Sequence, residues 1–206
     1  YSFQDSNNDG QFDSVVLQLV DGDPAWDGDG IANGSIIDPG FLGTGDRTLS
    51  GNNKDNTLQG NVLANTLLGK NGNDTLFGDL GNDTLIGNGK QDRLRGGEGD
   101  DNLKGKTGVD RLHGGDHDDR LNGGKGDDTL IGGSGADRFR LSKGNDLIKD
   151  FSMDDGDQIL IAGNVNLTMT QAGNNLVLSD SGKAISTTFS NTALDELLAY
   201  QPGLIA

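Results

Sequence analysis

The sequence lacks cysteine and has no long apolar run. None of its 206 residues is cysteine, so no disulfide can stabilise the fold. No stretch approaches the roughly 18 consecutive apolar residues that indicate a membrane-spanning helix. Lys and Arg number 16 against 32 Asp and Glu, and they are scattered rather than gathered in a stripe that could hold phosphates. The composition therefore argues against a membrane span and against nucleic-acid binding.

Patterns that indicate catalysis are also missing. The two histidines, His113 and His117, have an i, i+4 spacing that chelates a metal only on a helix. Gly-x-Gly patterns are frequent, but none of them follows a strand and opens a long helix, as a nucleotide site requires. Aspartates recur at the same position of successive repeats, whereas an active site occurs once in a chain, so these aspartates are better explained as ligands than as catalytic carboxylates. We therefore expect that the chain is not an enzyme.

Glycine and aspartate instead recur with a nine-residue period. The unit reads G-G-x-G-x-D-x-Φ-x, in which Φ is apolar, and positions one to nine are counted from its first glycine. Ten copies run from Gly51 to Arg140, and a partial eleventh keeps Gly144, Asp146 and Ile148 in phase. Position eight is Leu in nine copies and Phe139 in the tenth.

The period favours strands over helices. One apolar residue in nine cannot form the apolar face of an amphipathic helix, which needs spacings of three and four. A strand of about three residues centred on the apolar position fits better, and the glycine-rich remainder predicts a turn in which glycine supplies positive φ. Stacked units of this kind form a solenoid. With two units per coil, each residue lies on top of its equivalent two copies later.

That stacking places each position-six aspartate over another. Two carboxylates at a strand spacing repel and raise each other's pKa. Calcium removes this conflict, because it accepts six to eight oxygens from carboxylates and backbone carbonyls. Counting pairs two copies apart predicts about seven calcium sites, whose charge would nearly balance the net charge of −16. The predicted carboxylate ligands are Asp74, Asp83, Asp92, Asp101, Asp110, Asp119, Asp128, Asp137 and Asp146. The predicted carbonyl ligands lie near Gly69, Gly72, Gly78, Gly81, Gly87, Gly96, Gly97, Gly99, Gly105, Gly108, Gly114, Gly115, Gly123, Gly124, Gly126, Gly132, Gly133 and Gly135.

This repeat resembles that of the RTX (repeats-in-toxin), or hemolysin-type calcium-binding, family. The resemblance implies an all-β fold, a parallel β-roll with calcium bound in its turns, over residues 43–150. Two groups of residues depart from the pattern. The first two copies have Asn56 and Asn65 at position six and Lys54 and Leu63 at position four, which puts their sites in doubt. Lys90 and His117 replace the position-four glycine in two later copies, which would weaken those turns or change their backbone angles.

The N-terminal segment, 1–42, is rich in Asp and Gly. The run D-x-N-x-D-G-x-x-D resembles the short calcium loops of thrombospondin type 3 repeats, since alternate oxygens around a glycine turn can wrap one cation. The candidate ligands for one or two further ions are Asp5, Asn7, Asp9, Gln11, Asp13, Asp27, Asp29 and Asn33. The alternative is an Asx-rich turn closed by its own side chains. Trp26 lies between these acids, either as a platform for a sugar or packed on the first coil.

Residues 151–206 are expected to cap the roll. Phe151, Ile159 and Ile161 are the nearest apolar candidates to cover the last coil. A hairpin follows over 166–178 and continues through 184–188, and 192–200 has the pattern of a short helix. The family resemblance also implies an uncleaved type I secretion signal at the C-terminus.

Two functions remain open. The favoured one is a calcium-binding module that folds outside the cell and serves secretion, folding and stability of a larger exported or cell-surface protein. Its partners would be calcium, upstream domains and the type I secretion machinery, because the chain opens on Tyr1 and reads as the C-terminal portion of a longer protein. The alternative is a calcium-dependent polysaccharide-binding module, similar to the R-modules of alginate-modifying enzymes. Both place the chain in an extracellular or cell-surface location.

Overall fold

The structure is a computed structural model that describes residues 2–4, 14–16, 35–37, 47–161, 166–180, 182 and 185–192. The described residues form strands, turns and bends and contain no helix. None of them therefore forms a helix long and apolar enough to cross a membrane. The strands are β1 (Ser2–Gln4), β2 (Ser14–Val16), β3 (Ser35–Ile37), β4 (Arg47–Ser50), β5 (Thr57–Gln59), β6 (Asn65–Asn71), β7 (Thr75–Leu80), β8 (Thr84–Gly89), β9 (Arg93–Glu98), β10 (Asn102–Thr107), β11 (Arg111–Asp116), β12 (Arg120–Lys125), β13 (Thr129–Ser134), β14 (Arg138–Arg140), β15 (Gly144–Ile148), β16 (Gln158–Leu160), β17 (Leu167–Ala172), β18 (Asn175–Asp180) and β19 (Ile185–Phe189).

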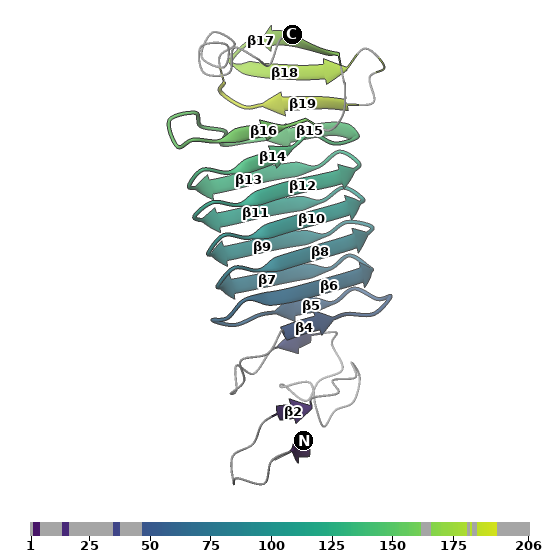
Figure 1. Cartoon of the computed structure of the whole chain (residues 1–206). Helices are drawn as coiled ribbons and strands as arrows, with labels where there is room; N and C mark the ends of the chain where they lie inside the picture. The colour runs from purple at the N-terminus through teal and green to yellow at the C-terminus, as the bar shows by residue number, and fades with distance from the viewer. Residues whose placement is uncertain are drawn as a thin grey trace.

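Successive strands alternate between two parallel sheets, which makes a β-roll. The even-numbered strands from β4 to β16 form one sheet in the order β16-β14-β12-β10-β8-β6-β4. The odd-numbered strands from β15 down to β3 form the other, so each coil of the roll contains one strand of each sheet (Figure 1). Leu103 pairs with Leu85 and Leu121, its equivalents two copies earlier and two copies later. The fold class and the two-unit coil predicted from the nine-residue period are confirmed.

Strands β6 to β13 are longer than the predicted three residues, whereas β5 and β14 keep that length. Strand β10, for example, runs for 6 residues, from position seven of one copy through position three of the next. Its register continues past the glycine bend, because Lys106 pairs with Gly124 and Thr107 with Lys125. These extra pairs satisfy backbone groups that a longer turn would leave unpaired. The turn is therefore only positions four to six.

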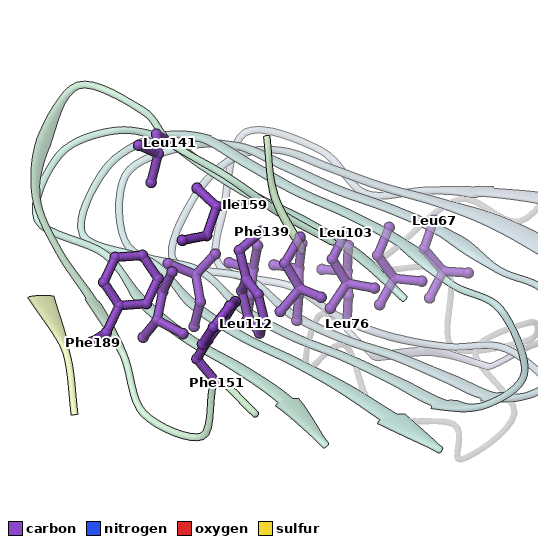
Figure 2. Packing of buried hydrophobic residues seen from close by; sticks show 14 of the residues in the cluster. Leu67, Leu76, Leu103, Leu112, Phe139, Leu141, Phe151, Ile159 and Phe189 are labelled. Carbon is purple, nitrogen blue, oxygen red and sulfur yellow. The ribbon is translucent and has the colours of Figure 1, made fainter. Parts of the chain in front are cut away.

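The position-eight side chains form the core. Leu76, Leu103 and Leu121 are among those fully buried between the two sheets, and the leucines lie in a single row along the axis (Figure 2). Each coil supplies two of them, so burial depends on the neighbouring coils rather than on any one unit. The interior of the roll is a one-dimensional stack of leucines.

Aromatic residues close the C-terminal end of that row. The ring of Phe151 lies 6.1 Å from that of Phe139 and 5.3 Å from that of Phe189, the latter edge-on. Ile159 on β16 pairs with Phe139 and is buried in the same cluster (Figure 2). Ile131, in contrast, is at an outward position and only partly buried, so it is not part of the face that needs covering.

The segment after the roll is β as predicted. Strands β17 and β18 form an antiparallel hairpin, and β18 pairs antiparallel with β19. Strand β19 then joins the roll by pairing parallel with β15. The helix predicted over 192–200 lies outside the described residues, apart from Thr192. The C-terminal secretion signal implied by the resemblance also lies outside them.

Candidate metal centre: a buried row of carboxylates

The position-six aspartates form two buried rows, one along each edge of the roll. All of them, from Asp74 to Asp146, are at most 3% exposed. In each pair the backbone N–H of one aspartate donates to Oδ1 of its equivalent two copies later, for example Asp74 to Asp92 at 2.8 Å and Asp92 to Asp110 at 2.9 Å. The seven pairs expected from the sequence are therefore brought together in the structure.

In all of these residues except Asp146, the second carboxylate oxygen has no partner. Oδ2 is buried and makes no hydrogen bond in Asp74, Asp83, Asp92, Asp101, Asp110, Asp119, Asp128 and Asp137. A buried carboxylate oxygen without a donor is unfavourable unless a proton or a cation satisfies it. Each of these oxygens can therefore accept a positively charged group without giving up a hydrogen bond.

The pKa values report the same imbalance. Burial raises the pKa of Asp83, Asp92, Asp128 and Asp137 to about 7, and that of Asp119 to about 8. Burial also raises the pKa of Asp101 and Asp110 to about 6, and moves the pKa values of Asp74 and Asp146 upward. The backbone N–H bonds oppose this shift, and the neighbouring carboxylate of the row adds to it at most sites. Without a bound cation, several carboxylates of the two rows therefore take up protons near neutral pH.

The position-one glycine makes room for the carboxylate of its own copy. A Cβ at Gly69 would lie 2.5 Å from Asp74 Oδ2 and 2.8 Å from the carbonyl oxygen of Gly87. The same two neighbours, the copy's own Oδ2 and the glycine carbonyl two copies later, surround the equivalent glycines Gly78, Gly96, Gly105 and Gly114. These glycines do not have positive φ, so their role is space and not backbone angle. A position-one carbonyl and an unpartnered carboxylate oxygen therefore approach the same glycine from two different coils.

Positions two and four are the ones that need positive φ. Gly97 and Gly99 have φ of 129° and 125°. Where glycine is replaced, the residue keeps the left-handed region, with φ of 76° at Lys90 and 80° at His117. Lys90 and His117 therefore change the φ angle at position four but preserve the turn, as one of the two predicted outcomes. The left-handed conformation costs about 1–2 kcal/mol for each L-residue that adopts it.

The first two copies close their turns differently. Asn56 Oδ1 accepts the backbone N–H of Asn52 at 2.7 Å, and Asn65 Oδ1 accepts that of Asn61 at 2.8 Å. An amide side chain carries no charge, so no cation is needed to balance it. Nδ2 of Asn56 and of Asn65 is buried without a partner but is uncharged. The doubt raised by the sequence about these two sites is therefore consistent with turns that offer a cation no carboxylate.

The row extends beyond the nine-residue period at its C-terminal end. Asp157 accepts the N–H of Asp137 at 2.9 Å through Oδ1, although their sequence separation is 20. Its Oδ2 accepts the N–H of Ser152, and Ser142 Oγ donates to Asp146 Oδ2 in a similar way. The nine-residue period did not predict Asp157, because this residue lies two positions after the one that the period specifies. The apolar Ile159 two residues after Asp157 matches the D-x-Φ pattern of the repeat and could have indicated it. At this end of the roll, hydrogen bonds satisfy the second oxygen.

A second, exposed row of side chains at position five was also missed. Asp118 donates its N–H to Asp100 Oδ1 at 3.2 Å, and Asn145 donates to Asp127 Oδ1 at 2.8 Å. The direction is opposite to that of the buried row, because here the later coil donates to the earlier one. The Asn73 N–H holds the pKa of Asp55 below its ordinary value. This row is satisfied by hydrogen bonds and does not need a cation.

The donor set fits calcium. It consists only of oxygens, from paired carboxylates and backbone carbonyls, which is the set that hard divalent cations prefer. Within the described ranges no three His, Cys, Asp or Glu side chains come together, so a cage made of side chains alone is not available there. His113 and His117 do not join the carboxylate rows. The candidate ligands Asp5, Asn7, Asp9, Gln11, Asp13, Asp27, Asp29 and Asn33, with Trp26, lie outside the described residues.

The family model for the RTX calcium-binding nonapeptide repeat matches the chain repeatedly, over residues 43–76, 50–85, 60–94, 77–112, 95–130 and 113–148. The chain belongs to this family. RTX repeats bind Ca²⁺, and the buried aspartate rows of the roll fit that role. The matched repeats account for about half of the chain and coincide with strands β4 to β15.

Two solved structures are similar to the chain. The extracellular lipase LipA from Serratia marcescens is 16% identical with a TM-score of 0.38, and the match covers 79% of this chain and 41% of the lipase. The AlgE6R3 subunit of the Azotobacter vinelandii mannuronan C5-epimerase is 22% identical with a TM-score of 0.26, covering 74% of this chain and 78% of the subunit. No curated protein sequence matches the chain. The matched region thus spans about two fifths of the lipase's length.

Proposed function

We propose that the chain is a calcium-triggered folding module of a larger exported or cell-surface protein. The observation that supports this most is the set of buried Oδ2 atoms without a partner. In low calcium, ionised aspartates at these positions would have to be buried beside each other, which opposes folding. When calcium is abundant, as it is outside cells, its binding free energy contributes directly to folding. A chain that is unfolded inside the cell and folds outside it would suit export through the type I secretion machinery.

The ligands we propose are the aspartates of the row, with the position-one and position-four backbone carbonyls. Each ion would lie between two coils, bound by carboxylates two copies apart. The seven pairs from 74/92 to 128/146 are the proposed sites, and Asp137 with Asp157 is a candidate eighth, because Asp137 Oδ2 is also unpartnered. The role of this module is structural, so any catalytic activity of the parent protein would belong to other domains.

A calcium titration followed by far-UV circular dichroism tests the proposal. We expect little β signal in excess chelator and a cooperative gain in millimolar calcium. Magnesium at the same concentration should be a poor substitute, because it demands octahedral geometry and keeps its waters. A fully folded spectrum in chelator would contradict the proposal.

Two neighbouring aspartates supply a matched pair of variants. Asp101→Asn removes a charge from the buried row, whereas Asp100→Asn removes the same charge from the exposed row and keeps its acceptor oxygen. The first should lower the number of bound calcium ions and shift the folding midpoint, and the second should change neither appreciably. Equal effects of the two variants would mean that calcium binding depends on the net charge of the chain and not on the buried carboxylates.

A further inference from the structure

The two edges of the roll carry opposite charges at their surfaces. One edge follows the even-numbered strands β4 to β14, and the other follows β7, β9, β11 and β13, whose carboxyl ends point to the opposite side (Figure 1). At the first, or lysine, edge the charged residues at positions two to five are Lys54, Lys70, Lys90, Lys106, Lys125 and Lys143, with Asp55 and Asp127. At the second, or acidic, edge they are Asp79, Glu98, Asp100, Asp116 and Asp118, with neither Lys nor Arg. The lysines of the repeats are therefore not scattered, as the sequence first suggested, but gathered at one edge.

Both sets of charges are stacked from coil to coil. Glu98 and Asp116 are direct Cα partners on β9 and β11, and a backbone bridge pairs Lys125 with Lys143. Neighbouring strands lie about 4.8 Å apart, so like charges on successive coils repel each other. The six lysines are exposed, and within the part of the chain that the structure describes no carboxylate forms an ion pair with them. A partner with opposite charges at the same spacing would remove the repulsion at each edge.

The acidic edge is hollowed. A groove of ≈ 600 Å³ lies at the carboxyl ends of β7, β9, β11 and β13. Three acids and one arginine line it: Asp79, Glu98, Asp116 and Arg95. Phe77 and Leu80, which is 40% exposed, add apolar surface to its walls. Lysine side chains suit such a groove, because the four-carbon stem packs on apolar surface while the ammonium group reaches a carboxylate.

Calcium removes the general repulsion between copies of the chain. The net charge of the chain alone is −16, which keeps molecules apart. The seven proposed calcium ions would nearly neutralise it, and a net charge near zero favours association. The inference below rests on the calcium-dependent folding proposed above, because the two edges exist only in the folded roll.

We propose that the folded roll associates side by side with further copies of itself, the lysine edge of one copy against the acidic edge of the next. Both edges belong to the same coils, so their charges repeat at the same spacing and can pair in register. The edges lie on opposite sides of the roll, so each pairing leaves one free edge of each kind. Such a heterologous contact continues beyond a dimer.

Sedimentation velocity of the full chain in saturating calcium and low salt tests the proposal, with circular dichroism recorded on the same samples. We expect the weight-average sedimentation coefficient to rise with protein concentration and to return toward the monomer value when salt is added, because salt screens exposed charges. A folded chain that stays monomeric at every concentration would overturn this inference alone. A chain that stays unfolded in calcium would contradict the folding proposal instead.

Two double variants neutralise one edge each. K106Q/K125Q removes two charges from the lysine edge, and E98Q/D116N removes two from the acidic edge. None of these residues is a proposed calcium ligand, so the calcium titration should be that of the parent chain. Each variant should associate roughly two- to thirtyfold more weakly, the range expected when two exposed ion pairs are lost. Undiminished association of K106Q/K125Q would mean that calcium bridges acidic edges, which would overturn the proposed pairing.

The outer face of the odd-numbered sheet supplies a matched control. Arg93 and Arg111 are Cα partners there, and R93Q/R111Q removes two exposed charges without changing either edge. This variant should associate like the parent chain, and weakening equal to that of K106Q/K125Q would overturn the proposal.

Mixing the two edge variants tests whether the edges are partners of each other. The K106Q/K125Q variant keeps its acidic edge, and the E98Q/D116N variant keeps its lysine edge. An equal mixture should therefore associate more strongly than either variant alone, mainly as complexes of two molecules. A mixture that sediments as the average of its two components would overturn the pairing of unlike edges.

Discussion

The first two copies of the repeat and the copies that follow them close the same turn with different chemistry. In the first two copies Oδ1 of Asn56 and Asn65 accepts the backbone N–H of Asn52 and Asn61, and the uncharged Nδ2 of each side chain is buried without a partner. In the following copies the isosteric aspartate leaves one buried oxygen without a partner. The parallel pairing is the same in both, because Leu67 and Leu85 pair in register across the boundary between them. One atom per copy, a neutral amide nitrogen in place of a carboxylate oxygen, therefore separates an uncharged turn from one that needs a cation.

The comparison explains why the fold and its metal dependence are separate properties. The leucine row and the parallel register continue through both regions, so hydrophobic stacking does not distinguish them. The carboxylates add a cost on burial that only a positive charge removes. We expect the Asp copies to respond to calcium and the Asn copies to depend on calcium only through the coils stacked on them.

The largest expected effect comes from Asp110→Ala. Asp110 lies between Asp92 and Asp128 in its row, so its loss should disturb two sites. Asp74→Ala should disturb fewer, because its neighbour on the N-terminal side is Asn56. Calcium stoichiometry from calorimetry distinguishes the two variants. If both lost the same amount of bound calcium, the pairing of aspartates two copies apart would not describe the sites.

A change of pH should alter the calcium-free Asp copies next. Their folded pKa values, about 6 to 8, lie above the pKa of about 3.9 for an unfolded Asp. The folded state therefore takes up protons first, so the calcium-free roll should be least stable above pH 8 and gain stability as the pH falls toward 4. Circular dichroism of resin-treated, calcium-free protein at pH 8.5 and 5.5 checks this direction.

Protons and calcium should compete for the same oxygens. The apparent calcium affinity should therefore fall over the same pH range in which the calcium-free roll becomes more stable. A calcium-free β signal that did not rise on acidification would mean that the buried carboxylates are not what opposes folding.

Converting the Asn copies into Asp copies sharpens the comparison. The variant N56D/N65D should bind up to two more calcium ions and require more calcium to fold, because it replaces two uncharged buried side chains with carboxylates. The control N52D changes a neighbouring turn residue of the same copy and adds no buried carboxylate. No gain in bound calcium in N56D/N65D would show that Lys54 and Leu63 at position four, and not the amides, prevent binding.

The smallest expected effect is that of His117→Gly. His117 occupies the left-handed region with φ of 80°, and glycine relieves that strain while increasing the freedom of the unfolded chain. The net stabilisation should be at most about 1 kcal/mol. Lys125, which does not have positive φ, is the control, since K125G should be destabilising. Melting temperatures in saturating calcium compare the two.

The sequence by itself determined the roll. A period of nine with one leucine and one aspartate in phase predicts the strand, the two-unit coil and the pairing of alternate copies, because those features follow from local spacing. It also marked Asn56 and Asn65 as exceptions. Each of these predictions depends on which residue stands at which position, and the chain repeats that information ten times.

Only the tertiary structure decided the features that arise between coils. Strands extend past the glycine bend because their neighbours supply hydrogen bonds there. Asp157 joins the row despite a spacing of 20, because the backbone absorbs the extra length where the last coil ends. The position-one glycine is needed for its contact with a carboxylate and with a carbonyl from another coil.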